Sequence, residues 1–131
     1  MNRLNDKDWD KQKKRVKKVV DKWLKPIGLG WWIVHLKYDT ENKDCDEEVA
    51  NCRVNWPYKE ATITFNLSVI ENLDDERLNY TVLHEFMHIF VREMRDMGTH
   101  EEFSDAIKHE ERVCTDLANA MMWAVDNVKK K

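Results

Sequence analysis

The sequence predicts an α+β fold in which one helix, a small mixed sheet and two further helices follow one another along the chain. Apolar residues recur at three- and four-residue steps in three segments, which is typical of amphipathic helices. Three shorter segments are rich in β-branched and aromatic residues, which is typical of strands. With 131 residues, of which 42% are hydrophobic, the chain is large enough for one domain over residues 1–131 with its own core.

The first helix is expected over residues 8–25, because Pro26 and Gly28 follow and end it. Its apolar face consists of Trp9, Val16, Val19, Val20, Trp23 and Leu24, and lysines fill the opposite face.

Charge is distributed unevenly along the chain. Residues 1–38 carry eleven basic and four acidic side chains, a net charge of +7, whereas residues 39–128 carry eight and twenty-one, a net charge of −13. We interpret the lysine face of the first helix as solvated; the alternatives are contact with nucleic acid or with the acidic remainder of the domain. No helix-turn-helix or RNA-binding pattern is present, so no motif supports a nucleic-acid partner.

Three strands are expected at residues 31–38, 50–56 and 61–67, in a sheet of three strands or slightly more. The second and third are joined by Pro57-Tyr58-Lys59-Glu60, which predicts a hairpin. The third strand alternates Ala61, Ile63, Phe65 and Leu67 with Thr62, Thr64 and Asn66, as a half-buried strand does. The acidic segment 39–48 is expected to be a solvated loop, because it lacks the glycine and the spacing of an EF-hand calcium loop.

A long helix is expected over residues 75–97, with acidic residues in its first turn and Gly98 at its end. It contains His84-Glu85-Phe86-Met87-His88, which is the pattern HExxH. Two histidines four residues apart project from one face of a helix, so they can bind one metal ion while Glu85 reaches a water molecule on that ion. The alternative is that both histidines are ordinary members of an amphipathic helix.

A catalytic zinc ion usually takes three protein ligands, so HExxH needs a partner. The metzincin extension is excluded, because it requires Gly at position 91 and His at position 94, where this chain has Val91 and Met94. The other option is a glutamate on a following helix. Glu110 and Glu111 lie 22 and 23 residues beyond His88, and a helical hairpin across Gly98 returns them to the histidines.

The last helix is expected over residues 99–128, because Thr99 and Glu102 form a capping-box pattern. Its apolar stripe consists of Phe103, Ala106, Ile107, Val113, Cys114, Leu117, Ala118, Met121 and Val125. Glu110 falls near the centre of this stripe and Glu111 near its edge. Periodicity therefore slightly favours Glu110 as the buried residue, and either glutamate stays a candidate ligand.

The HExxH helix and the downstream segment Glu111-Arg112-Val113-Cys114-Thr115-Asp116-Leu117-Ala118 together resemble the gluzincin branch of the zincins. They resemble most closely the small zincin-like metallopeptidases of phages and prophages, relatives of the ImmA/IrrE-type peptidases. The resemblance implies a minimal zincin-like fold and selects Glu111 as the third ligand. One Zn²⁺ per chain is then expected on His84, His88 and Glu111.

The same resemblance implies hydrolysis of peptide bonds in a peptide or protein substrate. Glu85 is expected to act as the general base, taking a proton from the zinc-activated water and passing it to the leaving amine. The candidates for a further donor to the oxyanion are His100, His109, Tyr58 and Tyr80. The strand at 61–67 resembles the edge strand with which zincins hold an extended peptide, and an internal strand is an equal alternative.

Two other functions fit the same residues. The first is a non-catalytic binding module, in which zinc stabilises a peptidase-derived fold and the basic first helix contacts nucleic acid or a protein partner. A structural zinc site usually has four protein ligands, and the lack of a strong fourth candidate favours catalysis. The second and weaker alternative function is a zinc hydrolase that acts on nucleic acid.

The expected location is the cytoplasm of a bacterial or phage-infected cell. The N-terminal residues are highly charged, unlike a signal peptide, and no transmembrane run is present. Cys45, Cys52 and Cys114 are odd in number and lack CxxC spacing. Free thiols in a reducing compartment fit this pattern better than disulfides or a second zinc site.

Overall fold

The computed structural model describes the backbone of residues 3–40, 49–96 and 103–129, and side chains within 9–40, 49–93 and 107–128. In chain order, the elements are α1 (Arg3–Leu24), β1 (Ile33–Asp39), β2 (Ala50–Asn55), the 3-10 helix η1 (Trp56–Tyr58), β3 (Glu60–Asn66), α2 (Leu67–Ile70), α3 (Asp75–Asp96) and α4 (Phe103–Lys129). This is the predicted α+β order, with η1 and α2 added. The expected cap at Thr99 and most of the loop 39–48 lie outside the described residues.

The three strands form one mixed sheet in the order β1-β3-β2, with β1 parallel and β2 antiparallel to β3. The predicted hairpin is therefore confirmed, and η1 makes its turn. Lys59 closes this turn in the left-handed conformation, with φ of 54°. The interpretation of residues 61–67 as an edge strand is wrong, because β1 returns to pair along the other side of β3. The edges of this sheet are β1 and β2.

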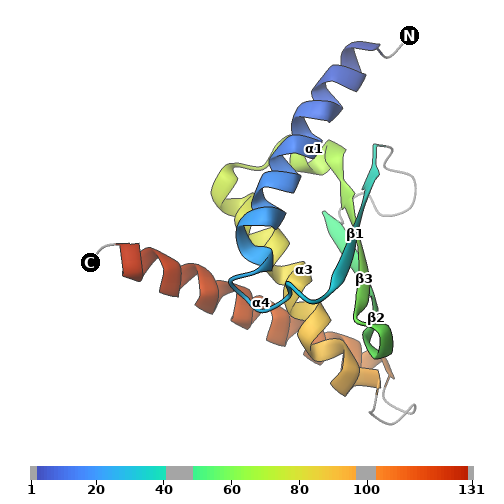
Figure 1. Cartoon of the computed structure of the whole chain (residues 1–131), viewed down its shortest axis with the longest axis vertical. Helices are drawn as coiled ribbons and strands as arrows, with labels where there is room; N and C mark the ends of the chain where they lie inside the picture. The colour runs from blue at the N-terminus through green and yellow to red at the C-terminus, as the bar shows by residue number, and fades with distance from the viewer. Residues whose placement is uncertain (1–2, 41–48, 97–102, 130–131) are drawn as a thin grey trace.

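One face of the sheet is apolar and packs on the helices. The strand register aligns its inward residues in rows across β1, β3 and β2, namely Val34, Ala61 and Val54; Leu36, Ile63 and Cys52; and Tyr38, Phe65 and Ala50. Ile63 and Phe65, on the central strand, are fully buried. Figure 1 shows α1 and α3 on the same side of this sheet, so the main core lies between the sheet and these two helices.

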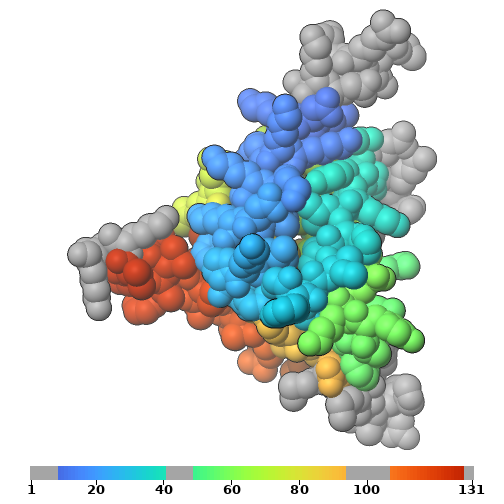
Figure 2. All heavy atoms as spheres, viewed as in Figure 1, coloured from blue at the N-terminus to red at the C-terminus, as the bar shows by residue number. Residues whose placement is uncertain are grey.

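Helix α1 docks through its apolar face, on which Val16 and Val20 are buried. Arg15 also crosses from α1 to the start of α3, donating to the carbonyl oxygens of Ile70 at 3.2 Å and Leu73 at 2.8 Å. The opposite face carries exposed lysines, namely Lys11, Lys13, Lys14, Lys17, Lys18 and Lys22. Figure 2 shows the outer surface of α1 open across the front of the molecule. The lysine face is thus exposed, which leaves its contact with a partner untested.

Helices α3 and α4 pack against each other, and this pair carries the HExxH motif and the two candidate glutamates. Cys114 and Ala118 of α4 are fully buried. Beyond them, α4 leads away from the sheet towards the C-terminus (Figure 1), and Trp123 there is 69% exposed. None of the described helices combines the length and the apolar composition needed to cross a membrane.

The central strand is expected to dominate stability. Replacing Ile63 by Ala leaves a cavity between β3 and the helices, so the free energy of unfolding should fall by about 2–5 kcal/mol. The matched control is Ile33→Ala in β1, where the side chain is 56% exposed and the loss should stay below about 1 kcal/mol. Denaturant unfolding of both variants measures the difference, and equal losses would contradict this assignment of the core.

Candidate metal centre

The HExxH residues lie on α3 where the helix faces α4. His84 and His88 are one turn apart, and their ring centroids are 5.0 Å from each other. Glu85 and His88 are buried, with 6% and 5% of their surfaces exposed, and His84 is half-buried. The motif therefore does not belong to a solvated helix surface. Nitrogen or oxygen atoms of all three residues lie within 4.8 Å of one another.

Helix α4 brings Glu111 to both histidines. One carboxylate oxygen, Oε2, is 3.0 Å from Nε2 of His84, and the other, Oε1, is 3.3 Å from Nε2 of His88. The Glu111 side chain is 53% exposed, so it reaches the imidazoles from the rim of the site. The Glu111 carboxylate thus lies between the Nε2 atoms of His84 and His88.

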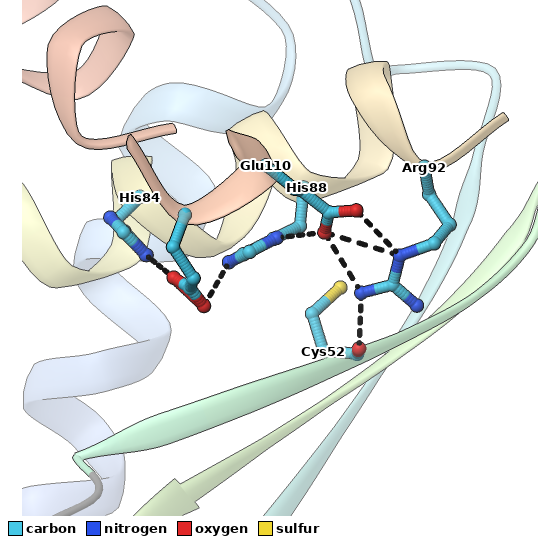
Figure 3. Close-up of polar contacts among 6 residues, drawn as sticks. Cys52, His84, His88, Arg92 and Glu110 are labelled. Atoms are coloured by element: carbon cyan, nitrogen blue, oxygen red, sulfur yellow. Dashed lines mark hydrogen bonds and ion pairs between the residues drawn. The ribbon is translucent and has the colours of Figure 1, made fainter. Parts of the chain in front are cut away.

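Glu110 occupies the inner side of the same cluster and is 5% exposed, as the periodicity of α4 predicts. Its Oε2 atom accepts a short hydrogen bond from Nδ1 of His88 (Figure 3). Arg92, one turn beyond His88 on α3, donates to Glu110 at 3.2 Å through Nε and also approaches it at 3.2 Å through Nη2. Through Nη2, Arg92 also donates to the carbonyl oxygen of Cys52 at 3.2 Å. One buried carboxylate therefore connects α4 with α3, and through Arg92 with β2.

The pKa shifts of this pair follow from its contacts. Burial disfavours the charged form of His88, but its hydrogen bond with Glu110 and the nearby charges of Glu85 and Glu111 outweigh burial and raise its pKa. Burial alone would raise the pKa of Glu110, but the hydrogen bonds from His88 and Arg92 outweigh it and lower the pKa. The Glu110 carboxylate is therefore charged and fixes the Nδ1 proton of His88.

His84 has a different environment. Burial lowers its pKa, and the hydrogen bond with Glu111 only partly offsets this effect. Its Nδ1 atom is buried and has no hydrogen-bond partner among the described residues. The ring of Tyr80 is tilted against it, with the centroids 5.9 Å apart. The neutral imidazole is thus the favoured form of His84.

Two free cysteines lie close to these groups. Cys52 and Cys114 are both buried and unpaired, and Cys114 approaches His88 and Glu110 within 4.8 Å. Burial raises the pKa of Cys52 to about 12 and raises that of Cys114 as well. A thiol must lose its proton to bind zinc, and Glu110 is already held by Arg92. The cluster with Cys114 is therefore a weaker metal site than the one with Glu111.

His84, His88 and Glu111 could together hold a metal ion. Ligand atoms about 2.1 Å from a tetrahedral zinc lie about 3.4 Å from one another. The nitrogen–oxygen distances of 3.0 and 3.3 Å to Glu111 are close to this spacing. Two imidazoles with one carboxylate are also a donor set that zinc accepts with an open fourth position.

A cavity of about 240 Å³ adjoins this cluster. It is lined by Val49, Ala50, Arg77, Tyr80, Thr81, His84, Glu85 and Glu111. Val49 directly precedes edge strand β2, Ala50 is the first residue of that strand, and the others come from α3 and α4. The cavity therefore lies beside edge strand β2 and next to Glu85.

Of the four residues expected as further donors, Tyr80 lines the cavity. Tyr58 and His109 are exposed and lie outside the lining, and His100 is outside the described residues. The sequence interpretation missed Arg92 and Arg77. Helical spacing could have found both, because residues 77, 80, 84, 88 and 92 follow one face of α3 at three- and four-residue steps.

No protein-family model matches this chain, and no curated protein matches it. Among solved structures, it is similar to the crystal structure of the metallopeptidase zymogen of Methanocaldococcus jannaschii jannalysin, with 21% sequence identity and a TM-score of 0.44. The match covers 75% of this chain and 96% of that chain. A likeness of this size establishes neither a family nor an activity, so the resemblance to ImmA/IrrE-type peptidases stays a prediction from the motifs.

Replacing Glu110 and replacing its neighbour Glu111 are expected to change the free energy of unfolding by different amounts. In the metal-free protein, Glu110→Ala leaves Arg92 buried without its carboxylate and should lower the free energy of unfolding by about 3 kcal/mol. Glu111→Ala removes a half-exposed carboxylate and should cost less than about 1 kcal/mol. Denaturant unfolding in the presence of a chelator tests both variants, and a larger loss for Glu111→Ala would contradict the structural role given to Glu110.

Proposed function

We propose that this protein is a zinc-dependent metallopeptidase of the gluzincin type that hydrolyses peptide bonds in a peptide or protein substrate. The observation that carries this proposal is the Glu111 carboxylate, which lies between the Nε2 atoms of His84 and His88. Glu85, the acid of the HExxH motif, lines the same cavity. Two unpaired buried thiols fit the reducing cytoplasm that the sequence predicts.

In this proposal, His84, His88 and Glu111 hold one Zn²⁺ per chain and leave a fourth position open for a ligand from solvent or substrate. When bound, zinc supplies a Lewis acid and brings the pKa of a coordinated water to about 7. Glu111 rather than Glu110 is the third ligand, because its carboxylate faces the Nε2 atoms of both rings. Glu110 faces the Nδ1 side of His88 and is occupied by Arg92.

Glu85 is the general base. It follows His84 directly in sequence, and its buried carboxylate lines the cavity. A carboxylate there can take a proton from the attacking water and later deliver it to the leaving amine. Burial next to a cationic centre keeps this proton transfer apart from bulk solvent.

Glu110 is a positioning residue. A histidine that binds zinc usually donates its other ring N–H to a carboxylate, which fixes the tautomer and the orientation of the ring. Glu110 accepts this hydrogen bond from Nδ1 of His88, leaving Nε2 free for the metal. Arg92 in turn holds Glu110 in place and compensates its charge.

Metal content tests the ligand set. Protein purified without added metal should contain one zinc ion per chain by plasma mass spectrometry, and Glu111→Ala should lose it. Glu110→Gln should keep the three ligands but weaken zinc affinity by about 10–100-fold, because it removes the charge that holds His88 and pairs with Arg92. Asp116→Ala, which removes an exposed acid of α4, is the matched control and should bind zinc normally. A parent protein that binds no zinc would overturn the proposal.

The role of Glu85 is tested by Glu85→Gln, which keeps the shape of the side chain and removes the base. Hydrolysis of a peptide library should fall by about 10²–10⁴-fold while zinc content stays at the parental level. Glu76→Gln, at an exposed acid in the first turn of α3, is the control and should retain activity. Parental activity in the Glu85→Gln protein would remove Glu85 as the base.

A further inference from the structure

We propose that Arg77 and Tyr80 form a subsite for a peptide carboxylate beside the metal centre, so that the enzyme selects substrates with an acidic group two to four residues from the cleaved bond. The carboxylate belongs either to an Asp or Glu side chain or to the C-terminus of the peptide. This inference rests on the proposed peptidase function and names the substrate class of the same site.

Arg77 is placed on the correct face of α3. It precedes His84 by seven residues, which is close to two full helical turns, so both side chains leave the same side of the helix. At a rise of about 1.5 Å per residue, the two positions are about 10 Å apart along the axis. Arg77 is therefore close enough to share a substrate with the metal centre, and too distant to contact the scissile bond.

Tyr80 connects the two positions. The guanidinium carbon of Arg77 is 4.9 Å from the centroid of the Tyr80 ring, which is a cation–π contact. The other neighbour of this ring is His84, at a centroid distance of 5.9 Å. The aromatic ring therefore holds the guanidinium above the cavity. A side chain that is already restricted in this way loses less conformational entropy when it binds a ligand.

Arg77 and Tyr80 line the same cavity as His84, Glu85 and Glu111. The lining also includes Val49 and Ala50, which directly precede and begin edge strand β2, respectively. A peptide extended along β2 advances about 3.3 Å per residue. The distance of about 10 Å from His84 then corresponds to about three residues.

The charge of Arg77 is available to a ligand. The arginines at positions 15 and 92 form ion pairs with Asp75 and Glu110, whereas Arg77 forms no ion pair with any residue that the structure describes. Asp74, its neighbour, uses its carboxylate to accept the backbone N–H of Arg77 at 2.8 Å and so caps α3. The guanidinium of Arg77 thus keeps its planar set of donors free.

Electrostatics favour an acidic ligand at this end of the cavity. Glu85 and Glu111 line the part next to the histidines, where the proposed zinc ion would compensate their charge. Arg77 is the cationic side chain in the lining, and a guanidinium can bind a carboxylate through two parallel hydrogen bonds. An acidic substrate group therefore binds at Arg77, which places the cleaved bond towards Glu85.

The experiment is a digest of a proteome-derived peptide library by the zinc-loaded protein, with cleavage sites mapped by mass spectrometry. The parent protein should show about tenfold enrichment, either of Asp or Glu at one position within four residues of the cut or of cuts two to four residues from the peptide C-terminus, as expected from one charge-assisted hydrogen bond. Arg77→Gln should reduce this enrichment below about twofold, and Arg77→Glu should shift the preference to Lys and Arg. Arg53→Gln, at an exposed arginine on the outer face of β2, is the matched control and should keep the parental profile.

Digestion of the same library after amidation of its C-termini separates the two sources of the carboxylate. Loss of preference on amidation identifies the peptide C-terminus, and a preference that persists identifies an acidic side chain. Zinc content and thermal unfolding of the Arg77 variants should equal those of the parent, since Arg77 is exposed. Cleavage with no preference for an acidic side chain or for a nearby peptide C-terminus, or with a preference that Arg77→Gln retains, would overturn the subsite and leave the peptidase proposal intact. Absence of cleavage by the zinc-loaded parent would instead contradict the peptidase function, and the subsite with it.

Discussion

The contact on which this structure depends is the buried carboxylate of Glu110, held between His88 and Arg92. Three elements meet there, because Glu110 comes from α4, both partners come from α3, and Arg92 continues to the backbone of β2 at Cys52. A buried charge is tolerated only where it is paired and hydrogen-bonded, so this contact fixes how the two helices and the sheet edge sit together. The rotation of α4 that buries Glu110 also directs Glu111 to the histidines.

Most of the fold could be predicted from the sequence, because its elements have strong local patterns. The alternation of Ile63 and Phe65 with threonines predicts a half-buried strand, and the spacing of Val82 and Phe86 predicts a buried helix face. The order of the strands could not be predicted. Whether β1 pairs beside β3 or elsewhere depends on contacts between distant segments, and local periodicity does not report them.

At the site, spacing alone predicted His84, Glu85 and His88, whereas periodicity slightly favoured Glu110 and the family resemblance selected Glu111. Periodicity describes how deep a residue lies, and it selected Glu110, which is indeed the buried one. It does not describe which ring nitrogen a carboxylate faces. Helical spacing places Arg92 on the same face of α3 as the histidines, but it does not identify the partner on α4 that gives Arg92 its role.

The adjacency of Glu110 and Glu111 has a consequence for how this protein can vary. Successive residues of a helix point about 100° apart, so the two carboxylates reach opposite nitrogens of one imidazole only in a single rotational setting of α4. Inserting or deleting one residue between Glu111 and Ala118 would rotate the buried stripe of α4 relative to the two glutamates. Burial of the stripe would then no longer place Glu110 against Arg92 and Glu111 against the histidines. Tolerated changes in length should therefore concentrate in the connections outside the helix pair, whereas the segment from Glu110 to Ala118 behaves as a unit of fixed register.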